Sequence, residues 1–267
     1  MGFLAEMVAR RSHRMAEEYG SLSPSDRERL ACCARPPRPF ASALRTREDV
    51  GLIAEVKKSS PSQGAIAPEC EASKQALHYE RGGAAAISVL VEPEVFGGAW
   101  SDLSDVADAV SVPVLAKDFV VDPVQLFAAR GHGADAVLLM VSVLGREVAS
   151  YLDLAATLGL EGLVEVHDLE ELAIAAEAGA ELVGVNSRDL STLEIDHARA
   201  HHVARAAHDG GLVVVAESGV ERRSDIEAVS MAGADAVLVG TALMRAPYPE
   251  EAVAEFIGVP KTRLGEM

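Results

Sequence analysis

The chain has 267 residues, 49% of them hydrophobic, so it is long enough to bury a barrel-sized core without disulfides or metal ions. Its formal net charge of -17 at pH 7 repels phosphate backbones and anionic lipid, which argues against nucleic acid and membrane surfaces as partners. Aromatic residues make up only 4% of the chain, too few for a base-stacking platform. An anionic ligand therefore needs locally concentrated basic groups.

Residues 1–48 are predicted to form a helical extension. Helical spacing covers residues 3–19 and 24–34, and a proline-rich stretch at 35–39 then ends it. From Gly51 onward, short apolar runs alternate with segments of helix length, so residues 49–267 are assigned to an α/β unit. We expect the extension and this unit to form one structural domain overall.

Eight strands are expected in the second part, at residues 52–57, 85–90, 114–117, 136–140, 162–166, 182–186, 213–217 and 236–239. A glycine followed by alanine recurs before every second strand, from Gly83 to Gly233, as in a fold built from repeated pairs of βα units. This pattern predicts a closed (β/α)8 TIM barrel. An open doubly wound sheet is the alternative, but no Gly-x-Gly-x-x-Gly fingerprint follows the first strand.

Ionisable residues lie near the ends of the odd-numbered strands: Glu55 and Lys57, Lys117, Glu165, and Glu217. The end of a strand buried on both faces tolerates charge only if it opens into a site, and active sites of (β/α)8 barrels gather at the carboxyl ends of the strands. Glu55 and Lys57 are two residues apart and so point to the same face. The other interpretation of this pair is a structural ion pair beside a polar turn.

Lys117 and Glu165 are expected to face each other in the barrel mouth. In a partly dry site they can hold opposite protonation states and act as acid and base, although a buried structural salt bridge is the alternative. Asn186 ends the sixth strand and points inward, and Arg188 follows it with a guanidinium suited to an anion. Arg188 could instead pair with Asp189.

Three glycine-bearing segments are candidates for binding an anion. Residues 59–64 form a hydroxyl-rich loop after the first strand, Ser218 and Gly219 follow the seventh strand, and Gly240 and Thr241 follow the eighth. Glycine permits close backbone approach, and the loops after strands 7 and 8 are the common phosphate site of this fold. The alternative is that these segments are tight turns.

Several segments together resemble the indole-3-glycerol phosphate synthase family. They are IAEVKK at 53–58 with SPS at 60–62, FGG at 96–98, KDF at 117–119, LVEVH at 163–167, VNSRDL at 185–190 and ESG at 217–219. The resemblance implies a cofactor-free barrel enzyme with its N-terminal helical extension over the barrel mouth. It also implies conversion of 1-(2-carboxyphenylamino)-1-deoxyribulose 5-phosphate to indole-3-glycerol phosphate with loss of carbon dioxide and water, in tryptophan synthesis.

The same resemblance implies roles for the candidate residues. Lys117 protonates the substrate carbonyl oxygen, Glu165 is the general base or acid of dehydration, and Lys57 pairs with an anionic group; the order of proton transfers between the two lysines stays open. The remaining catalytic candidates hold hydroxyl and amine groups and are Glu55, Asn186 and Glu217. The substrate-binding candidates are Ser60, Gly219, Gly240 and Thr241 for the phosphate, Phe96 and Phe119 for the aromatic ring, and Arg188 and Ser218 around them.

Three positions depart from the family pattern. Val91, Ala99 and Ala116 stand where Thr, Ser and Arg are common, which predicts a mouth with fewer hydrogen-bonding groups and leaves open a specialised indole pathway. The rival functions are phosphoribosylanthranilate isomerase, a Schiff-base aldolase using Lys117, and a non-catalytic barrel.

The chain is expected to bind a small sugar phosphate and no metal or cofactor. Its three cysteines, Cys32, Cys33 and Cys70, show no metal-ligand spacing and are predicted to be reduced. Its start lacks the apolar core of a signal peptide, and its most apolar stretch, 136–144, is too short to span a bilayer. We expect a cytoplasmic monomer or weak homo-oligomer.

Overall fold

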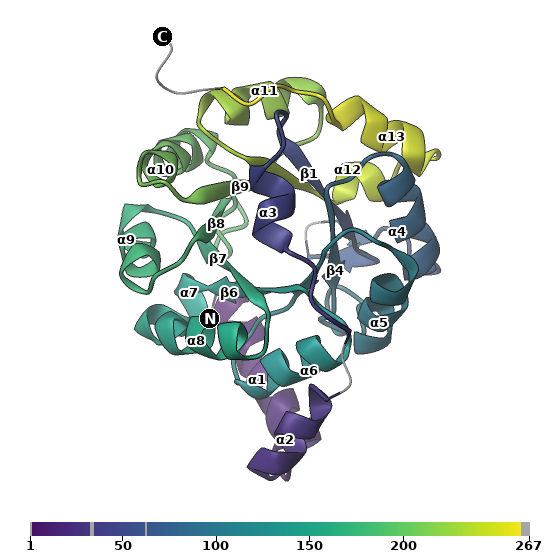
Figure 1. Cartoon of the computed structure of the whole chain (residues 1–267), viewed down its shortest axis with the longest axis vertical. Coiled ribbons are helices and arrows are strands. Elements are labelled where there is room, and N and C mark those ends of the chain that lie inside the picture. The colour runs from purple at the N-terminus through teal and green to yellow at the C-terminus, as the bar shows by residue number, and fades with distance from the viewer. Residues whose placement is uncertain (1, 33–34, 62, 263–267) are drawn as a thin grey trace.

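The computed structural model describes residues 2–32, 35–61 and 63–262, and its centre is a closed barrel of eight parallel strands (Figure 1). The barrel order is β1-β10-β9-β8-β7-β6-β5-β4, so each strand pairs with the next barrel strand along the chain and β10 closes onto β1. The strands are β1 Gly51–Val56, β4 Ala86–Leu90, β5 Val114–Lys117, β6 Ala136–Met140, β7 Glu161–Val166, β8 Leu182–Asn186, β9 Val213–Glu217 and β10 Ala236–Val239. The predicted (β/α)8 fold is confirmed, and each predicted strand agrees with an observed one to within one residue at each end.

A short hairpin follows β1 at the carboxyl end of the barrel, where only a loop was expected. Its strands are β2 Ser59–Ser60 and β3 Gly64–Ala65, and they pair antiparallel. Gly64 has φ 64, a left-handed conformation that glycine adopts without steric cost. Ser62, within the predicted loop, lies outside the described residues.

Helices surround the barrel on its outside (Figure 1). They are α4 Ala72–Arg81, α5 Trp100–Ala109, α6 Val124–Gly131, α7 Val141–Leu144, the 3-10 turn η1 Gly145–Glu147, α8 Val148–Thr157, α9 Leu169–Glu177, α10 His197–Asp209, α11 Arg223–Met231, α12 Thr241–Met244 and α13 Pro249–Phe256. Within the described residues, none of the helices is both long enough and apolar enough to cross a membrane.

Two apolar cores result from the alternation of side chains along each strand. Leu52, Ala54 and Val56 of β1 belong to the outer core between the strands and the helices. Ile53 belongs to the inner core inside the barrel. Because Glu55 is on the same face of β1 as Ile53, its carboxylate also enters the barrel.

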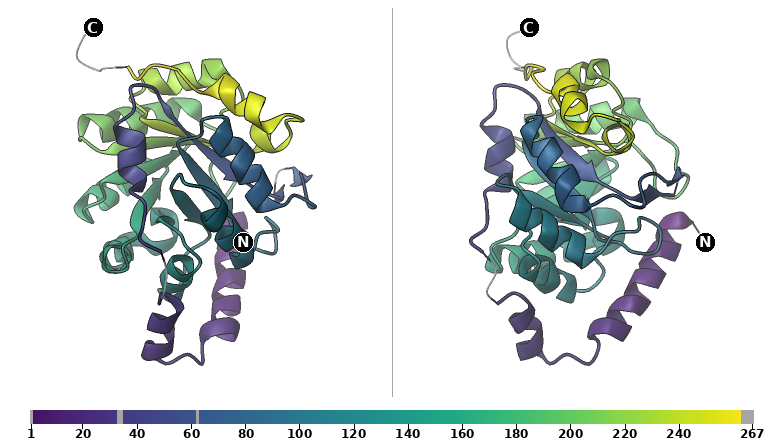
Figure 2. Two further views of the ribbon diagram at one scale, coloured as in Figure 1. Left: turned by 45° about the vertical axis from the view of Figure 1, so that its right-hand side comes forward. Right: turned by 90° about the vertical axis from the view of Figure 1, so that its right-hand side faces the viewer.

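The N-terminal extension contacts both ends of the barrel (Figure 2). Helix α1, Phe3–Tyr19, lies at the carboxyl end, where Arg11 forms a buried ion pair with Asp118 just after β5. The short helix α2, Pro24–Leu30, packs beside α6. Helix α3, Phe40–Arg45, lies at the opposite, amino end of the barrel.

Helix α1 therefore forms the expected extension over the mouth, whereas α3 covers the amino end of the barrel, here called the floor. Its Phe40 and Leu44 are fully buried within the inner core. The backbone N–H groups of Phe40 and Ala41 donate to the carboxylate of Glu161 at the start of β7, at 2.7 and 2.9 Å. The apolar face of α3 and these two hydrogen bonds hold the helix at the amino end of the barrel.

Candidate active site

Four ionisable side chains form one layer near the carboxyl end of the barrel. Glu55, Lys117, Glu165 and Glu217 come from β1, β5, β7 and β9, which alternate around the barrel. In a (β/α)8 barrel, alternate strands supply the four side chains of each interior layer. The three carboxylate residues are at most 3% exposed, so the layer is almost dry.

Two ammonium groups pair with carboxylates of this layer. Lys57 Nζ lies 2.6 Å from Glu55 Oε1, and Lys117 Nζ lies 2.7 Å from Glu217 Oε2 and 3.5 Å from Glu55 Oε2. The alternative of a Lys117–Glu165 salt bridge is not observed, because Glu217 and Glu55 hold the ammonium group of Lys117. Gly184 permits this arrangement, since a Cβ there would be 2.1 Å from Glu217 Oε1.

The charge balance of the layer explains its protonation. Three carboxylates and two ammonium groups leave one excess negative charge if all are ionised, and burial makes that charge costly. Burial, reinforced by the neighbouring Glu217, raises the pKa of Glu165 to about 7. Burial also acts to raise the pKa of Glu55, but Lys57 and Lys117 outweigh it and hold that pKa below its usual value.

The protonation of Lys117 follows from the same balance. Burial acts to lower the pKa of its ammonium group, but Glu217, Glu55 and Glu165 together raise that pKa above its ordinary value. The ammonium group of Lys117 is therefore charged at neutral pH. Glu165 is the group of the layer that can change protonation state near neutrality.

Asn186 and Arg188 lie beside this layer, after β8. The side chain of Asn186 is buried, hydrogen bonds to Glu165, and accepts a hydrogen bond from the backbone N–H of Arg188 at 3.0 Å. Arg188 Nη1 donates to the carbonyl of Leu193 at 2.8 Å. Asp189 instead accepts from the backbone N–H and the hydroxyl of Ser191, so the alternative Arg188–Asp189 pair does not form. In the described parts of the chain, the guanidinium of Arg188 lines the pocket and bonds to a backbone carbonyl rather than to a carboxylate.

The predicted phosphate-binding residues lie along the wall formed by β1, β9 and β10. The Ser60 hydroxyl is buried and has no hydrogen-bond partner among the described residues. Ser218 and Gly219 have φ of 65 and 73, so two successive left-handed residues shape the turn after β9. At Gly240, which precedes α12, a Cβ would be 2.2 Å from Glu55 Oε1, so this position must also be small to accommodate the carboxylate.

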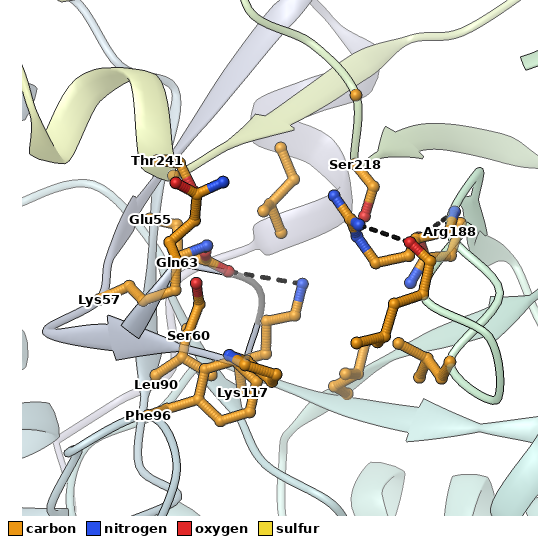
Figure 3. A pocket seen from close by; sticks show the side chains of 18 of the residues that line it. Glu55, Lys57, Ser60, Gln63, Leu90, Phe96, Lys117, Arg188, Ser218 and Thr241 are labelled. Carbon is orange, nitrogen blue, oxygen red and sulfur yellow. Dashed lines mark hydrogen bonds and ion pairs between the residues drawn. The ribbon is translucent and has the colours of Figure 1, made fainter. Parts of the chain in front are cut away.

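The pocket above the layer has a volume of about 450 Å³, within the usual range for small-ligand sites. Figure 3 shows Glu55, Lys57, Ser60 and Thr241 on one side of it and Arg188 with Ser218 on the other. Phe96 and Phe119 also line the pocket, with ring centroids 6.2 Å apart. The pocket thus joins a polar wall to an aromatic one. Every predicted site residue lines it except Glu217, whose carboxylate pairs with Lys117.

The lining residues that were not predicted from the sequence include Phe3, Glu92 and Arg245. Phe3 reaches the pocket from the start of α1. The buried Glu92 carboxylate accepts from the backbone N–H groups of residues 94, 95 and 96, and so fixes the loop that carries Phe96. Arg245 Nη2 donates to Gln63 at 2.6 Å and ties α12 to the β2–β3 hairpin. Arg245 could have been identified from the sequence, because it follows the predicted phosphate-binding residue Thr241 by one helical turn.

The three departures do not affect the mouth in the expected way. Val91 and Ala116 belong to the outer core, between strands and helices, and so replace no pocket group. Ala99 is the N-cap residue of α5 and supplies no side-chain hydrogen bond there. The prediction that the pocket has lost hydrogen-bonding groups at these positions is wrong, and the change at Ala99 concerns a helix end.

Residues 4–256 match the family model described as indole-3-glycerol phosphate synthase. The match covers more than half of the chain and contains all the predicted site residues. The chain belongs to the indole-3-glycerol phosphate synthase family.

Several proteins named after this family are similar to the chain over most of their length. The chain is 44% identical over 260 residues to indole-3-glycerol phosphate synthase 1 of Streptomyces coelicolor, covering 96% of this chain and 95% of that protein. It is 46% identical over 244 residues to indole-3-glycerol phosphate synthase of Mycobacterium avium, covering 91% and 89%. The corresponding protein of Micrococcus luteus is 47% identical over 232 residues, covering 85% and 86%.

Solved structures of other barrel proteins share the fold. A 3-hexulose-6-phosphate synthase matches with a TM-score of 0.64 and 19% identity, covering 78% of this chain and 98% of that one. Thiamine phosphate pyrophosphorylase from Pyrococcus furiosus matches with a TM-score of 0.60 and 19% identity, covering 82% and 96%. At these identities the likeness concerns the fold alone.

Proposed function

We propose that this chain catalyses the reaction for which its family is named. Its substrate is 1-(2-carboxyphenylamino)-1-deoxyribulose 5-phosphate, and its product in tryptophan biosynthesis is indole-3-glycerol phosphate. The observation that carries the chemistry is a charged Lys117 held between Glu55 and Glu217, beside a Glu165 that titrates near neutrality. This layer has a strong acid–base capacity in a dry site, which ring closure and dehydration both need.

The substrate fits the two walls of the pocket. We place the aromatic ring against Phe96 and Phe119, and the phosphate near the free hydroxyl of Ser60 and the backbone of Gly219, Gly240 and Thr241. Backbone N–H groups in the first turn of a helix lack partners within the helix and are suited to an anion. Arg188 and Lys57 add positive charge on opposite sides of the pocket, and Ser218 completes the wall beside Arg188.

In the first step, the ring carbon that bears the carboxylate attacks the ketone carbon of the sugar. A carbon–carbon bond forms, and the carbonyl oxygen takes a proton from the ammonium group of Lys117 to become a hydroxyl. The carboxylate then leaves as carbon dioxide, and its bonding electrons return to the ring. Lys117 is suited to this role because its carboxylate neighbours keep it protonated until negative charge develops on the oxygen.

In the second step, the new hydroxyl leaves as water and a proton is lost from the substrate. We assign to Glu165 either the acceptance of the proton lost from the substrate or the donation of a proton to the leaving hydroxyl. Its pKa of about 7 makes both protonation states accessible. Glu55, Glu217 and Asn186 hold the hydroxyl and amine groups and keep the two acid–base residues in position. Lys57 pairs with an anionic group of the substrate.

The rival functions fit the site less well. A Schiff-base aldolase needs an uncharged lysine as nucleophile, whereas the carboxylates around Lys117 raise its pKa. An isomerase needs no group to assist decarboxylation. A non-catalytic barrel would have no reason to keep four ionisable side chains in a nearly dry layer, where burying charge is costly.

The test is formation of indole-3-glycerol phosphate, followed by fluorescence, by the wild type beside Lys117→Ala and Glu165→Gln. Each variant is expected to lose activity by ~100-fold or more, the usual effect of removing an acid–base group. Lys74→Ala, at an exposed lysine of α4, is the matched control and should match the wild type. No product from a folded wild type would refute the assignment and favour the isomerase or the non-catalytic barrel.

We propose that the protein is a monomer or a weak homo-oligomer. The cytoplasmic location stays a prediction.

A further inference from the structure

His167 lies just beyond β7, two residues after Glu165, and no step above uses it. Its ring Nδ1 lies 3.0 Å from Glu171 Oε2, and its backbone N–H donates to the same oxygen at 2.8 Å. Glu171 is itself in the first turn of α9, where its backbone N–H is capped by the side chain of Asp168 at 2.9 Å. These bonds fix the orientation of the imidazole ring.

The other ring nitrogen faces the acid–base glutamate. His167 Nε2 lies 3.5 Å from Glu165 Oε1. Both atoms are buried, and neither has a hydrogen-bond partner in the described portion of the chain. An unpaired buried polar atom is costly, and here two such atoms point to each other. Because His167 does not line the pocket, this arrangement concerns Glu165 rather than the substrate.

We propose that His167 is a positioning residue that shares one proton with Glu165, with Glu171 holding its ring in place. This inference rests on the proposed acid–base role of Glu165. Before Glu165 gives a proton to the departing hydroxyl, the shared proton moves to its carboxylate from the imidazolium of His167. The Nε2–H bond breaks, a bond between that proton and Oε1 forms, and the electron pair stays on the nitrogen. When Glu165 accepts a proton, the transfer runs in reverse, so no other reactant is needed.

The charged groups around the pair make this exchange feasible. Glu165 faces Glu217 of β9 and Lys117 of β5, besides His167. His167 faces Glu171 of α9 and Arg199 of α10 as well as Glu165. Burial acts to lower the pKa of His167, but Glu171 and Glu165 raise it above its ordinary value. The pKa of each group therefore depends on the protonation state of the other, as sharing a proton requires.

Two substitutions separate the two functions of the ring. His167→Gln places an amide nitrogen near the position of Nε2, so it can bond to Glu165 but cannot titrate. His167→Asn places its amide near Nδ1, so it keeps the bond to Glu171 and leaves Glu165 without a neighbour. His202→Gln, at an exposed histidine of α10, is the matched control.

We expect kcat to fall about 10-fold in both variants while KM stays within about twofold, because His167 does not touch the substrate. Loss of the imidazolium also raises the pKa of Glu165, so the limb of the pH profile assigned to Glu165 should move to higher pH in His167→Gln. A pH profile that superimposes on that of the wild type would overturn the proposal, even if kcat falls. Wild-type kcat in His167→Gln would overturn it too.

A measurement without turnover tests the pair directly. The ring nitrogen shifts of His167 are followed by NMR against pH in the wild type and in Glu165→Gln. Removing the carboxylate should lower the pKa of His167, whereas an unchanged titration curve would overturn the proposal. If the wild type made no product but this coupling were present, the proposed function alone would fail. Normal turnover without the coupling would refute only the proton sharing.

Discussion

The buried ion pair between Arg11 and Asp118 attaches α1 to the barrel mouth, and Arg11→Met removes it. Arg11 Nη2 lies 2.6 Å from Asp118 Oδ2, and its Nε lies 3.0 Å from Oδ1, with both side chains 3% exposed. Methionine keeps much of the apolar stem and leaves the carboxylate without its cation. Asp118 retains hydrogen bonds from the Gln125 amide and from the backbone N–H of Phe119.

Breaking a buried pair at one partner costs about 3–5 kcal/mol, and the retained hydrogen bonds favour a value near ~3 kcal/mol. In a chain of this size, that corresponds to a fall in Tm of roughly 6–12 °C. Arg14→Met on the same helix is the control: Arg14 pairs with Glu18 at the surface, where removal should cost under ~1 kcal/mol. The assay is thermal unfolding followed by circular dichroism.

The loss of stability in Arg11→Met should also depend on pH. Burial raises the pKa of Asp118 even with Arg11 present, and loss of the cation raises it further. A carboxyl with a folded-state pKa above its unfolded value favours folding at low pH, and this contribution is lost as pH rises through the folded pKa. Arg11→Met should therefore lose less stability at pH 5 than at pH 8. An Arg11→Met variant as stable as Arg14→Met at both pH values would refute the reasoning.

Three other outcomes are expected. Gly240→Ala places a Cβ against the carboxylate of Glu55. The variant should fold but lose about 10-fold or more in kcat, as measured by product fluorescence. A wild-type kcat would show that the carboxylate moves aside freely. Ala99→Ser supplies the missing N-cap of α5 and should stabilise the protein by ~0.5–1 kcal/mol in urea unfolding, whereas no gain would mean that the helix end is already satisfied. The pH profile of kcat should bend near pH 7, rising with pH if Glu165 is the limiting base and falling if it is the limiting acid; a bend that persists in Glu165→Gln would assign it to another group.

The fold and the membership of the site were predictable because both depend on local patterns. Runs of apolar residues define strands buried on both faces, and a charge near the end of such a run indicates a site. Glu55, Lys117, Glu165 and Glu217 were therefore identifiable from the sequence, and barrel geometry placed them in one layer.

The pairing within the layer was not predictable in this way. Lys117 pairs with Glu217 because Gly184 leaves space for that carboxylate, and this is a contact between strands far apart in the sequence. The role of Glu92 was hidden for a similar reason, since its partners are backbone N–H groups that no pattern of side chains reveals. The floor position of α3 depends on Glu161, more than 100 residues away.

The contacts of α1 and α3 with opposite ends of the barrel affect the order in which parts of the chain fold during synthesis. The hydrogen-bond partner of Arg11 is Asp118, 107 residues later in the chain. The partner of the Phe40 backbone N–H is Glu161, 121 residues later. Because the chain is synthesised from its N-terminal end, α1 and α3 have no docking site until β5 and β7 have been made. Helices α1 and α3 therefore dock after the middle strands are made, and until then the apolar face of α3 is available to chaperones.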